Sequence, residues 1–234
     1  MKILAIDTAT EACSSALWLD GEIHARFEIA GREHTQRLLP QVAALLAGCG
    51  VTYAQLDGIV CGVGPGSFAG VRIGVGFVKG IALALDRPVV GVSSLAMLAQ
   101  GAVREQGAQQ VLSVIDARMG EVYFGAYACD TQRLVRPLLA ETVCAPQEIP
   151  AAPAAGTWCA AGTGWGVYEE RLRAAASCRI DALAPAALPH AQDALPLALS
   201  QFNAGQGISA DRLLPVYLRN KVALTLIEQR ALRK

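Results

Sequence analysis

The stretch KILAIDTATEACSSALWLDGEIHARFEI, residues 2–29, decides the fold because it contains three consecutive segments of strand character. An apolar run ends in Ile6-Asp7 and is followed by a turn; SSALWLD then leads through Gly21 to EIHARFEI. The alternation of apolar and polar residues in the last segment is typical of a strand with one exposed face. The stretch therefore predicts a meander of a buried strand, a hairpin and a further strand.

A second stretch, about 110 residues later, repeats this order. VLSVIDARMGEVYFGAYACDTQRLVRPLL, residues 111–139, has an apolar strand that ends in Ile115-Asp116, a short turn and two further strand segments. The match is either an internal duplication or a coincidence, since the Ile-Asp pair is short. The shared order of elements favours a duplication.

Strands alternate with helices between the two repeats, which indicates a layered α/β fold. The segments expected there are a helix over 34–47, a buried strand over 58–63, a helix over 71–85, a strand over 88–92 and a helix over 94–105. After the second repeat we expect a loop over 146–155, a strand and turn over 157–165, an irregular stretch over 184–196, and a final element over 210–233 that ends in a helix.

Composition restricts the class of protein. The 234 residues are 53% hydrophobic and 17% charged, with mean hydropathy +0.36 and formal net charge zero. The charge balance argues against nucleic-acid binding by the overall field, and the low charge suggests a surface covered by a protein partner. The seven cysteines form no CxxC pair, which is typical of reduced thiols. Without a signal peptide pattern, the sequence predicts a soluble cytoplasmic protein.

The stretch GVGPGSFAGVRIG, residues 62–74, lacks the Gly-Lys-Ser/Thr ending of a phosphate-binding Walker loop. Ser67 is expected to cap the helix that follows. In this helix, Gly74, Gly76 and Gly80 each cost about 1 kcal/mol relative to alanine. The rest is apolar on every side, apart from Arg72 and Lys79, and is too short to span a bilayer. Such a helix is either an ordinary core helix of a three-layer fold or part of a subunit interface, and the residues alone leave both open.

The doubled hairpin with an aspartate at the end of its first strand resembles the actin, Hsp70 and sugar-kinase superfold. Within it, ILAIDTAT, HTQRLLP, GVGPGSFAGVRIG and PVYLRNKVA together resemble the bacterial TsaB (YeaZ) family. One departure is Ala69, where the family usually has threonine. The resemblance implies a scaffold role in making threonylcarbamoyladenosine beside the anticodon of tRNAs that read ANN codons. It also implies pairing with the catalytic TsaD subunit, recruitment of the TsaE ATPase, and contact with tRNA through the complex.

The fold implied is a duplicated α/β actin-like ATPase fold with two subdomains, each a mixed β-sheet flanked by helices, and a reduced second copy. We expect the N-terminal subdomain over 1–103, rejoined by a C-terminal helix over about 210–234, and the C-terminal subdomain over 104–209. In the superfold, glycines in the hairpin turns let backbone N–H groups hold phosphates. Here both turns are poorly shaped for this, so we expect vestigial nucleotide loops formed by Asp7, Thr8, Thr10, Asp116 and Arg118.

The sequence predicts no catalytic residue, no firm cofactor site and no metal site. Its three histidines, His24, His34 and His190, do not have the spacing of metal ligands. Any ATP or ADP is expected to bind weakly or to be shared across an interface. The alternative is an enzyme of the same superfold, with weak ATPase, kinase-like or glycopeptidase-like activity; a tRNA-binding module is a third possibility.

With the family resemblance, the interface interpretation of the apolar helix leads. The helices over 34–47 and 71–85 are then expected to dock on the homologous catalytic subunit, or on a second copy as a homodimer when the chain is alone. No membrane partner is expected. The predicted interface residues are His34, Arg37, Leu38, Gln41, Val42, Leu45, Arg72, Val75, Gly76, Lys79, Gly80 and Leu83.

Overall fold

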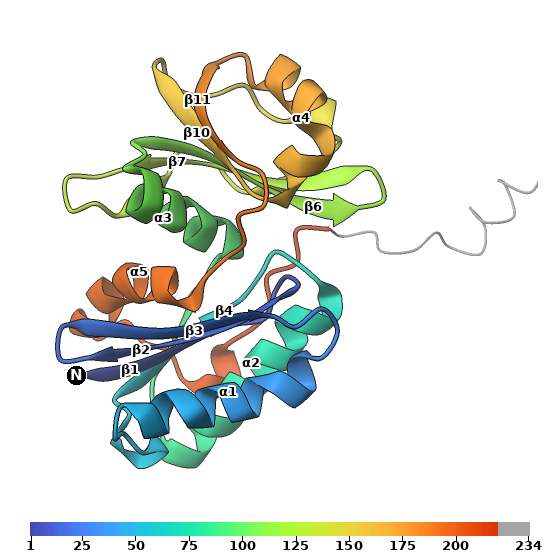
Figure 1. The fold of residues 1–234 in the computed structure, drawn as a ribbon. Helices are drawn as coiled ribbons and strands as arrows, with labels where there is room; N and C mark the ends of the chain where they lie inside the picture. Colours follow the sequence, from blue (N-terminus) through green and yellow to red (C-terminus); the bar gives the residue numbers. More distant parts are fainter. Residues whose placement is uncertain (220–234) are drawn as a thin grey trace, which may run out of the picture.

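A computed structural model describes residues 1–219 of the chain and shows two β-sheets stacked with helices between and outside them (Figure 1). The strands are β1 (Lys2–Asp7), β2 (Ala12–Leu19), β3 (Glu22–Ile29), β4 (Gly58–Gly62), β5 (Val89–Val92), β6 (Gln110–Arg118), β7 (Glu121–Cys129), β8 (Val135–Pro137), β9 (Thr142–Cys144), β10 (Thr157–Ala161) and β11 (Arg179–Ala184). The helices are α1 (His34–Gly48), α2 (Phe68–Leu85), α3 (Ser94–Gln106), α4 (Thr163–Ala176) and α5 (Ala191–Asn203).

The two sheets have the same topology, which confirms the predicted duplicated α/β fold. The first has the strand order β3-β2-β1-β4-β5, and the second has β11-β10-β6-β7-β8, with β9 also paired to β7. In the first sheet, β1 pairs antiparallel with β2 and parallel with β4. In the second, β6 pairs in the same way with β7 and β10. The Ile-Asp pairs therefore occupy equivalent places, at the end of β1 and two residues before the end of β6.

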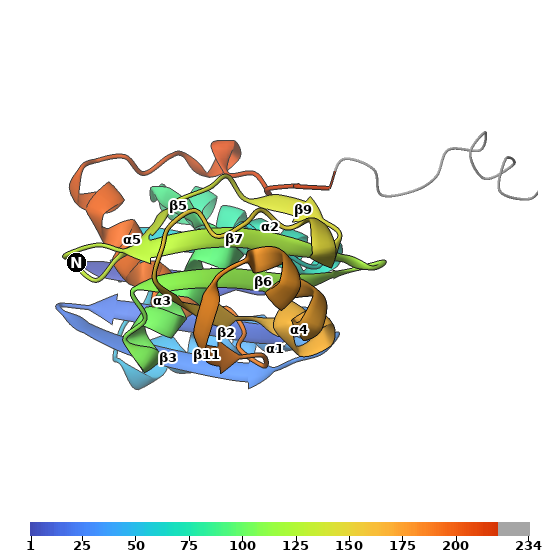
Figure 2. The same ribbon diagram turned by 90° about the horizontal axis from the view of Figure 1, so that it is seen from above.

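Alternate residues of β1 face opposite sides of the first sheet, as a strand buried on both faces requires. Leu4 and Ile6 pack with the inward faces of α1 and α2, whereas Ile3 and Ala5 pack with α5. On the second sheet, α3 covers one face and α4 the other. Helices α3 and α5 thus lie between the two sheets, and α1 and α2 form an outer layer (Figures 1 and 2). We call the first sheet with α1, α2 and α5 the first lobe, and the second sheet with α4 the second lobe.

Two helices begin where the sequence-based expectation has irregular structure or a turn. The stretch 184–196, expected to be irregular, contains the start of α5, with Pro196 inside the helix. The buried residues Ala194, Leu195 and Ala198 pack on the first sheet, and this packing offsets the cost of an internal proline. The turn expected after the strand over 157–161 is instead the start of α4.

The subdomain boundary predicted at residue 209 does not follow the packing, because α5 lies within 104–209 but packs against the first sheet. In the described part of the final element, residues 210–219, Ala210–Arg212 forms a short 3-10 helix and 213–219 has no regular secondary structure. The rest of the C-terminal helix expected over 210–234 lies outside the described residues.

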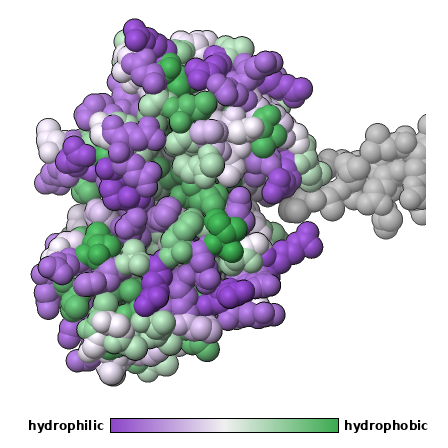
Figure 3. Space-filling model, in the orientation of Figure 1, coloured by the Kyte–Doolittle hydropathy of each residue, from purple (hydrophilic) through white to green (hydrophobic). Residues whose placement is uncertain are grey.

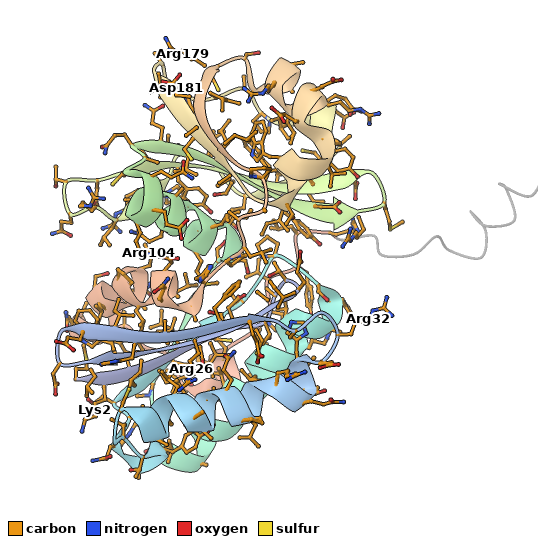
Figure 4. All side chains as sticks on the ribbon, in the orientation of Figure 1. Lys2, Arg26, Arg32, Arg104, Arg179 and Asp181 are labelled. Carbon is orange, nitrogen blue, oxygen red and sulfur yellow. The ribbon has the colours of Figure 1, made fainter. Side chains whose placement is uncertain are left out.

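A bidentate ion pair joins the two helices between the lobes. Arg104 of α3 donates from Nε to Asp193 Oδ1 at 2.8 Å and from its second terminal nitrogen to Oδ2 at 3.0 Å. Asp193 is 2% exposed, and a Cβ at the neighbouring Gly101 would lie 3.1 Å from its Oδ2, a tight contact. Figure 4 shows Arg104 at this junction of α3 and α5. The pair fixes α5, and with it one face of the first sheet, to the helix that leads into the second lobe.

Candidate functional site

The turn after β1, predicted as a vestigial nucleotide loop, is enclosed by α2. The Thr8 hydroxyl donates to the Gly70 carbonyl at 2.7 Å, and the Ser67 N–H donates to the Ala9 carbonyl at 2.7 Å. Thr8 and Thr10 are both buried. A phosphate at this turn needs accessible N–H or hydroxyl donors, and here the Thr8 hydroxyl is bonded to the helix and the Ala9 N–H to Asp7 Oδ1.

Asp7 is buried completely beneath the same turn. Its Oδ1 accepts a hydrogen bond from the Ala9 N–H at 3.2 Å, and its Oδ2 has no partner among the described residues. Burial raises the pKa of the Asp7 carboxyl from 3.8 to about 7, against the opposing effects of the Ala9 N–H and the Ser94 side chain. Gly62 permits this placement, because a Cβ there would collide with the carboxylate. Asp7 is thus sealed behind β4 and cannot reach a ligand from solvent.

The equivalent turn of the second lobe is exposed to solvent, and the charge of its aspartate is neutralised by an arginine of the same turn. Asp116 Oδ2 accepts from Arg118 Nη1 at 2.7 Å, and its Oδ1 accepts from the Arg118 N–H at 2.9 Å. Arg118 is 82% exposed and Asp116 only 8%. Arg118, Met119 and Gly120 all have φ between 58° and 78°, a left-handed run that turns the hairpin tightly. The two predicted loops therefore differ in exposure, one buried and one exposed, and no hydrogen bond or ion pair among the described residues joins them.

The segment over 213–219 connects the end of β4 to this second turn. The Val216 N–H donates to the Val63 carbonyl at 2.8 Å, which holds the segment beside β4. Further along, Arg219 donates to the carbonyls of Ala117 and Arg118 at 3.1 and 3.3 Å and pairs with Glu121. The segment thus ties the first lobe to the β6–β7 turn.

The glycines of α2 and the loop before it form two groups with different surroundings. A Cβ at Gly66 or Gly70 would collide with the backbone of the first turn, and one at Gly74 would lie 2.7 Å from Thr8 Oγ1. At Gly76 and Gly80, an added Cβ would meet no atom of residues 1–219 within 4 Å. The first group lets α2 pack against the turn, whereas the second leaves bare backbone on the outer face of the helix.

The predicted interface residues divide in the same way. His34, Leu38, Gln41, Val42, Leu45 and Val75 are buried within the chain and cannot present side chains to a partner, so this part of the predicted surface is wrong. The physical reason is that the apolar stripe of α1 packs on its own sheet. The remaining members lie at the surface or partly buried: Arg37, Arg72, Gly76, Lys79, Gly80 and Leu83.

The outer face of α2 has a large apolar side chain near each end: Leu83, which was predicted, and Phe68, which was not. Phe68 is 58% exposed and Leu83 66% exposed. The Arg72 guanidinium lies 3.2 Å from the Phe68 ring centroid and 4.9 Å from that of Tyr217. The Phe68–Arg72 spacing of four residues was the available sequence signal, but it required a helix that starts at Phe68 and not at Val71.

Helix α2 also has the length and the mean hydropathy, 1.7 over 18 residues, that a membrane span would need. Within the chain, 33% of it is buried. The sequence-based estimate of a segment too short for this was therefore wrong, because Ser67 caps the helix three residues earlier than expected. The N–H of Gly70 donates to the Ser67 hydroxyl at 3.3 Å. Core helices of soluble proteins pass the same test of length and hydropathy, so it does not identify a span.

Comparisons with known proteins agree with this architecture. A family model described as TsaD, tRNA N6-adenosine threonylcarbamoyltransferase, matches residues 21–220. The tRNA threonylcarbamoyladenosine biosynthesis protein TsaB of Escherichia coli K12 is 44% identical over 225 residues, which cover 95% of this chain and 96% of that protein. TsaB of Haemophilus influenzae is 37% identical over 233 residues, with 95% of both chains covered.

Solved structures show the same similarity over nearly the whole chain. Two solved structures from Pseudomonas aeruginosa, one described as YeaZ and one as similar to peptidase YeaZ, are 48% and 49% identical. Each has a TM-score of 0.87 and covers 93% of this chain and 99% of its own. With the E. coli and H. influenzae relatives, these matches show that the chain belongs to the TsaB (YeaZ) family.

Proposed function

We propose that this chain is a non-catalytic subunit of the machinery that forms threonylcarbamoyladenosine in tRNA. It docks on a homologous TsaD-type catalytic subunit through the outer face of α1 and α2. The relatives named TsaB support the pathway, and the match to the TsaD model supports a partner with a similar fold. Two similar folds can pair through equivalent helices in a pseudo-twofold arrangement.

The outward position of Gly76 and Gly80 carries this proposal. Each glycine costs about 1 kcal/mol relative to alanine in a helix interior, and nothing in the described residues uses the space. A partner helix that approaches closely over bare backbone would offset this cost. Exposed Leu39 on α1, at 56%, and Leu83 on α2 would add apolar area to such an interface. Along the lower edge of the molecule, over this outer layer, Figure 3 shows pale green and white atoms among the purple.

The burial of the first turn and the ion pair within the second turn support a non-catalytic role. Asp7, the residue that a nucleotide-hydrolysing relative would use beside a metal ion, is sealed from solvent, and Asp116 is paired with Arg118. We propose that the chain alone holds no nucleotide tightly, and that any ATP or ADP binds weakly or at the assembled interface. The TsaE ATPase and tRNA enter as partners of the assembled complex in the cytoplasm, and the chain alone pairs as a homodimer.

The test is complex formation between this chain and the TsaD-type subunit of the same bacterium, followed by sedimentation velocity. Gly80→Leu should fold, since its side chain meets open space, and should lose the complex. Ala174→Leu, which adds the same side chain to the exposed face of α4 in the second lobe, is the matched control and should retain it. Complex formation by Gly80→Leu with unchanged affinity would contradict the docking surface.

The non-catalytic half of the proposal is tested with the chain alone. Magnesium and ATP, with and without peptide substrates, should give no turnover above that of an Asp7→Ala variant. Turnover by the wild-type chain that disappears in Asp7→Ala would favour the enzyme alternative.

A further inference from the structure

Strand β3 forms an open edge of the first sheet. Among residues 1–219 it pairs only with β2, and no backbone hydrogen bond reaches its other side. Alternate residues of Glu22–Ile29 therefore present N–H and C=O groups to solvent. Figure 2 shows β3 along one edge of the molecule. An edge of this kind can accept a further strand through main-chain hydrogen bonds.

Strand β3 lacks most of the features that keep edge strands apart in soluble proteins. It has eight residues with no proline and no lysine, and it keeps one register with β2 over its whole length. Ile23, Phe27 and Ile29 are 39%, 38% and 63% exposed, on the face opposite to the one that contacts α1. The charges of the strand therefore decide which other strand can pair with this edge.

The charged residues of β3 lie on the face that contacts α1. Arg26 donates to the Ala44 carbonyl at 3.4 Å, and Glu28 accepts a hydrogen bond from the Gln41 side chain at 3.3 Å. Neither Arg26 nor Glu28 forms an ion pair within residues 1–219. A strand that pairs with this edge can therefore offer each of them an opposite charge.

A second copy of the chain supplies these opposite charges. A twofold axis perpendicular to the sheet keeps equivalent faces on the same side, so one residue of β3 must lie opposite itself in an antiparallel pair. When that residue is Phe27, each Arg26 faces a Glu28 and each Ala25 faces an Ile29. The pair then has two opposite-charge contacts on one face and apolar contacts on the other, and such cross-strand pairs stabilise a sheet.

Most other registers bring like charges together. Centred on Arg26, the pair sets two arginines opposite each other, and centred on Glu28 it sets two glutamates. Centred on Ala25, it sets each Glu22 opposite a Glu28. Like charges directly opposite each other destabilise a pair of strands. The charge pattern therefore selects among the registers.

One other register is compatible with the charges. Centred on His24, it pairs each Arg26 with a Glu22, but Phe27 and Ile29 then extend past the start of the opposite strand. The register centred on Phe27 is favoured because it brings these exposed apolar side chains into the interface.

The surroundings of β3 leave room for this pairing. A groove between β3 and α1, lined by side chains that include Glu28 and Gln41, runs beside the residues that would pair. Arg26 of the second copy would enter this groove opposite Glu28. A further cation at the groove, Arg37, is already paired with Glu33. Helix α1 packs over β2 and β3, and α2 packs over β4, so this edge is separate from the outer face of α2.

We propose that β3 is a self-association surface, through which two copies of the chain join their first sheets edge to edge with Phe27 opposite Phe27 and Arg26 opposite Glu28. The inference rests on the proposed function only for the existence of a homodimer, and it does not use the docking face of α1 and α2. Five residues per strand form a small interface, so we expect a weak dimer that depends on concentration.

Charge exchange tests both the surface and the register, by sedimentation velocity of the full chain over a range of concentrations. Arg26→Glu and Glu28→Arg should each self-associate about tenfold or more weakly than wild type, because each converts two attractive pairs into repulsive ones. Both changes in one chain restore opposite charges and should bring self-association back to within about threefold of wild type. A mixture of the two single variants should form mixed dimers more tightly than either variant forms with itself, which also shows that both are folded.

Glu22→Arg is the matched control, because it reverses a charge on the same face of the same strand outside the paired residues, and its self-association should equal that of wild type. Weaker self-association of Arg26→Glu and Glu22→Arg, with Glu28→Arg unchanged, would indicate the register centred on His24 and overturn the inference. Unchanged self-association in all variants, or none by the wild-type chain at the highest concentration reached, would also overturn it.

These outcomes are separable from failure of the proposed function. If the wild-type chain does not bind the TsaD-type subunit, the docking proposal fails, whereas the comparison of β3 variants is unaffected. If the complex with the TsaD-type subunit forms while the β3 variants self-associate as wild type does, the docking proposal stands and the role of β3 does not.

Discussion

Gly74 and Gly80 lie in the interior of the same helix, but Gly74 faces the first turn and Gly80 faces outward. The same substitution at the two positions therefore measures the contact between α2 and the first turn. Replacement of either by alanine gains about 1 kcal/mol from helix propensity. At Gly80 the new methyl group meets no atom within 4 Å in the described part of the chain, so the gain should appear in full. Gly80→Ala should therefore stabilise the chain by up to about 1 kcal/mol, or about 2–4 °C in Tm for a chain of this size.

At Gly74 the same methyl group would lie 2.7 Å from Thr8 Oγ1. Either the first turn shifts, at a cost typical of overpacking of about 1–3 kcal/mol, or Thr8 rotates and loses its hydrogen bond to Gly70, at a cost of about 1 kcal/mol. After the gain in propensity, Gly74→Ala should range from neutral to destabilising by about 2 kcal/mol. The difference between the two variants, about 1–3 kcal/mol, is the energy of the contact between α2 and the turn.

The assay is urea denaturation followed by circular dichroism, with the midpoint and slope measured for wild type and both variants. An unchanged slope is needed for the midpoints to report stability alone. Equal stability of Gly74→Ala and Gly80→Ala would refute the assignment of the two glycines to different surroundings. Loss of stability in Gly80→Ala would show that the outer face of α2 is covered by its own chain.

Three further predictions concern buried and bridging charges. Because the pKa of Asp7 is about 7 in the folded chain and 3.8 ordinarily, the folded state holds the proton more tightly, and wild-type stability should fall as pH rises from about 4 to 7. Asp7→Asn cannot titrate, so its stability relative to wild type should improve by on the order of 2–3 kcal/mol between pH 5 and pH 8 in urea denaturation; a constant difference would show that the carboxyl titrates normally. Arg104→Ala should lower the free energy of unfolding by about 2–4 kcal/mol, because it leaves Asp193 buried without its partner. Asp193→Asn added to Arg104→Ala should recover part of this loss. Strictly additive effects in the double-mutant cycle would count against the coupling. Arg219→Ala should speed amide exchange in the turn over 117–121 while the exchange of β1 and β4 stays unchanged, and equal protection of the turn in both chains would mean that the bridge contributes nothing.

Much of the architecture could be predicted because local patterns and packing agree. The Ile-Asp repeats, the alternating strand before Ile29 and the short connections all indicate strands whose order the structure confirms. Pro196 was misleading because its helix is stabilised by contacts with a sheet formed more than 100 residues earlier in the chain. Such tertiary packing leaves no local signal.

The candidate site could be predicted only in part. Periodicity finds the apolar stripe of α1, but that stripe faces its own sheet, so Leu38 and Val42 were assigned to the wrong side. The spacing of glycines in and before α2 is also ambiguous, because Gly66, Gly70 and Gly74 share the four-residue spacing of Gly76 and Gly80. Only the position of the first turn, which is set by the fold, separates the inward glycines from the outward ones.

Residues 191–216 come after the second sheet in the chain but pack on the first sheet. This affects the order in which the lobes can fold during translation. The second sheet is complete once residue 184 has left the ribosome. The first sheet still needs α5 to cover one face, the bridge of Ile208 to Val89, and the contact of Val216 with Val63. Domains usually fold in the order of their synthesis. Here the half of the molecule that is synthesised first is the half that is finished last, and a nascent chain paused after residue 184 exposes the apolar side of β1 to the cell.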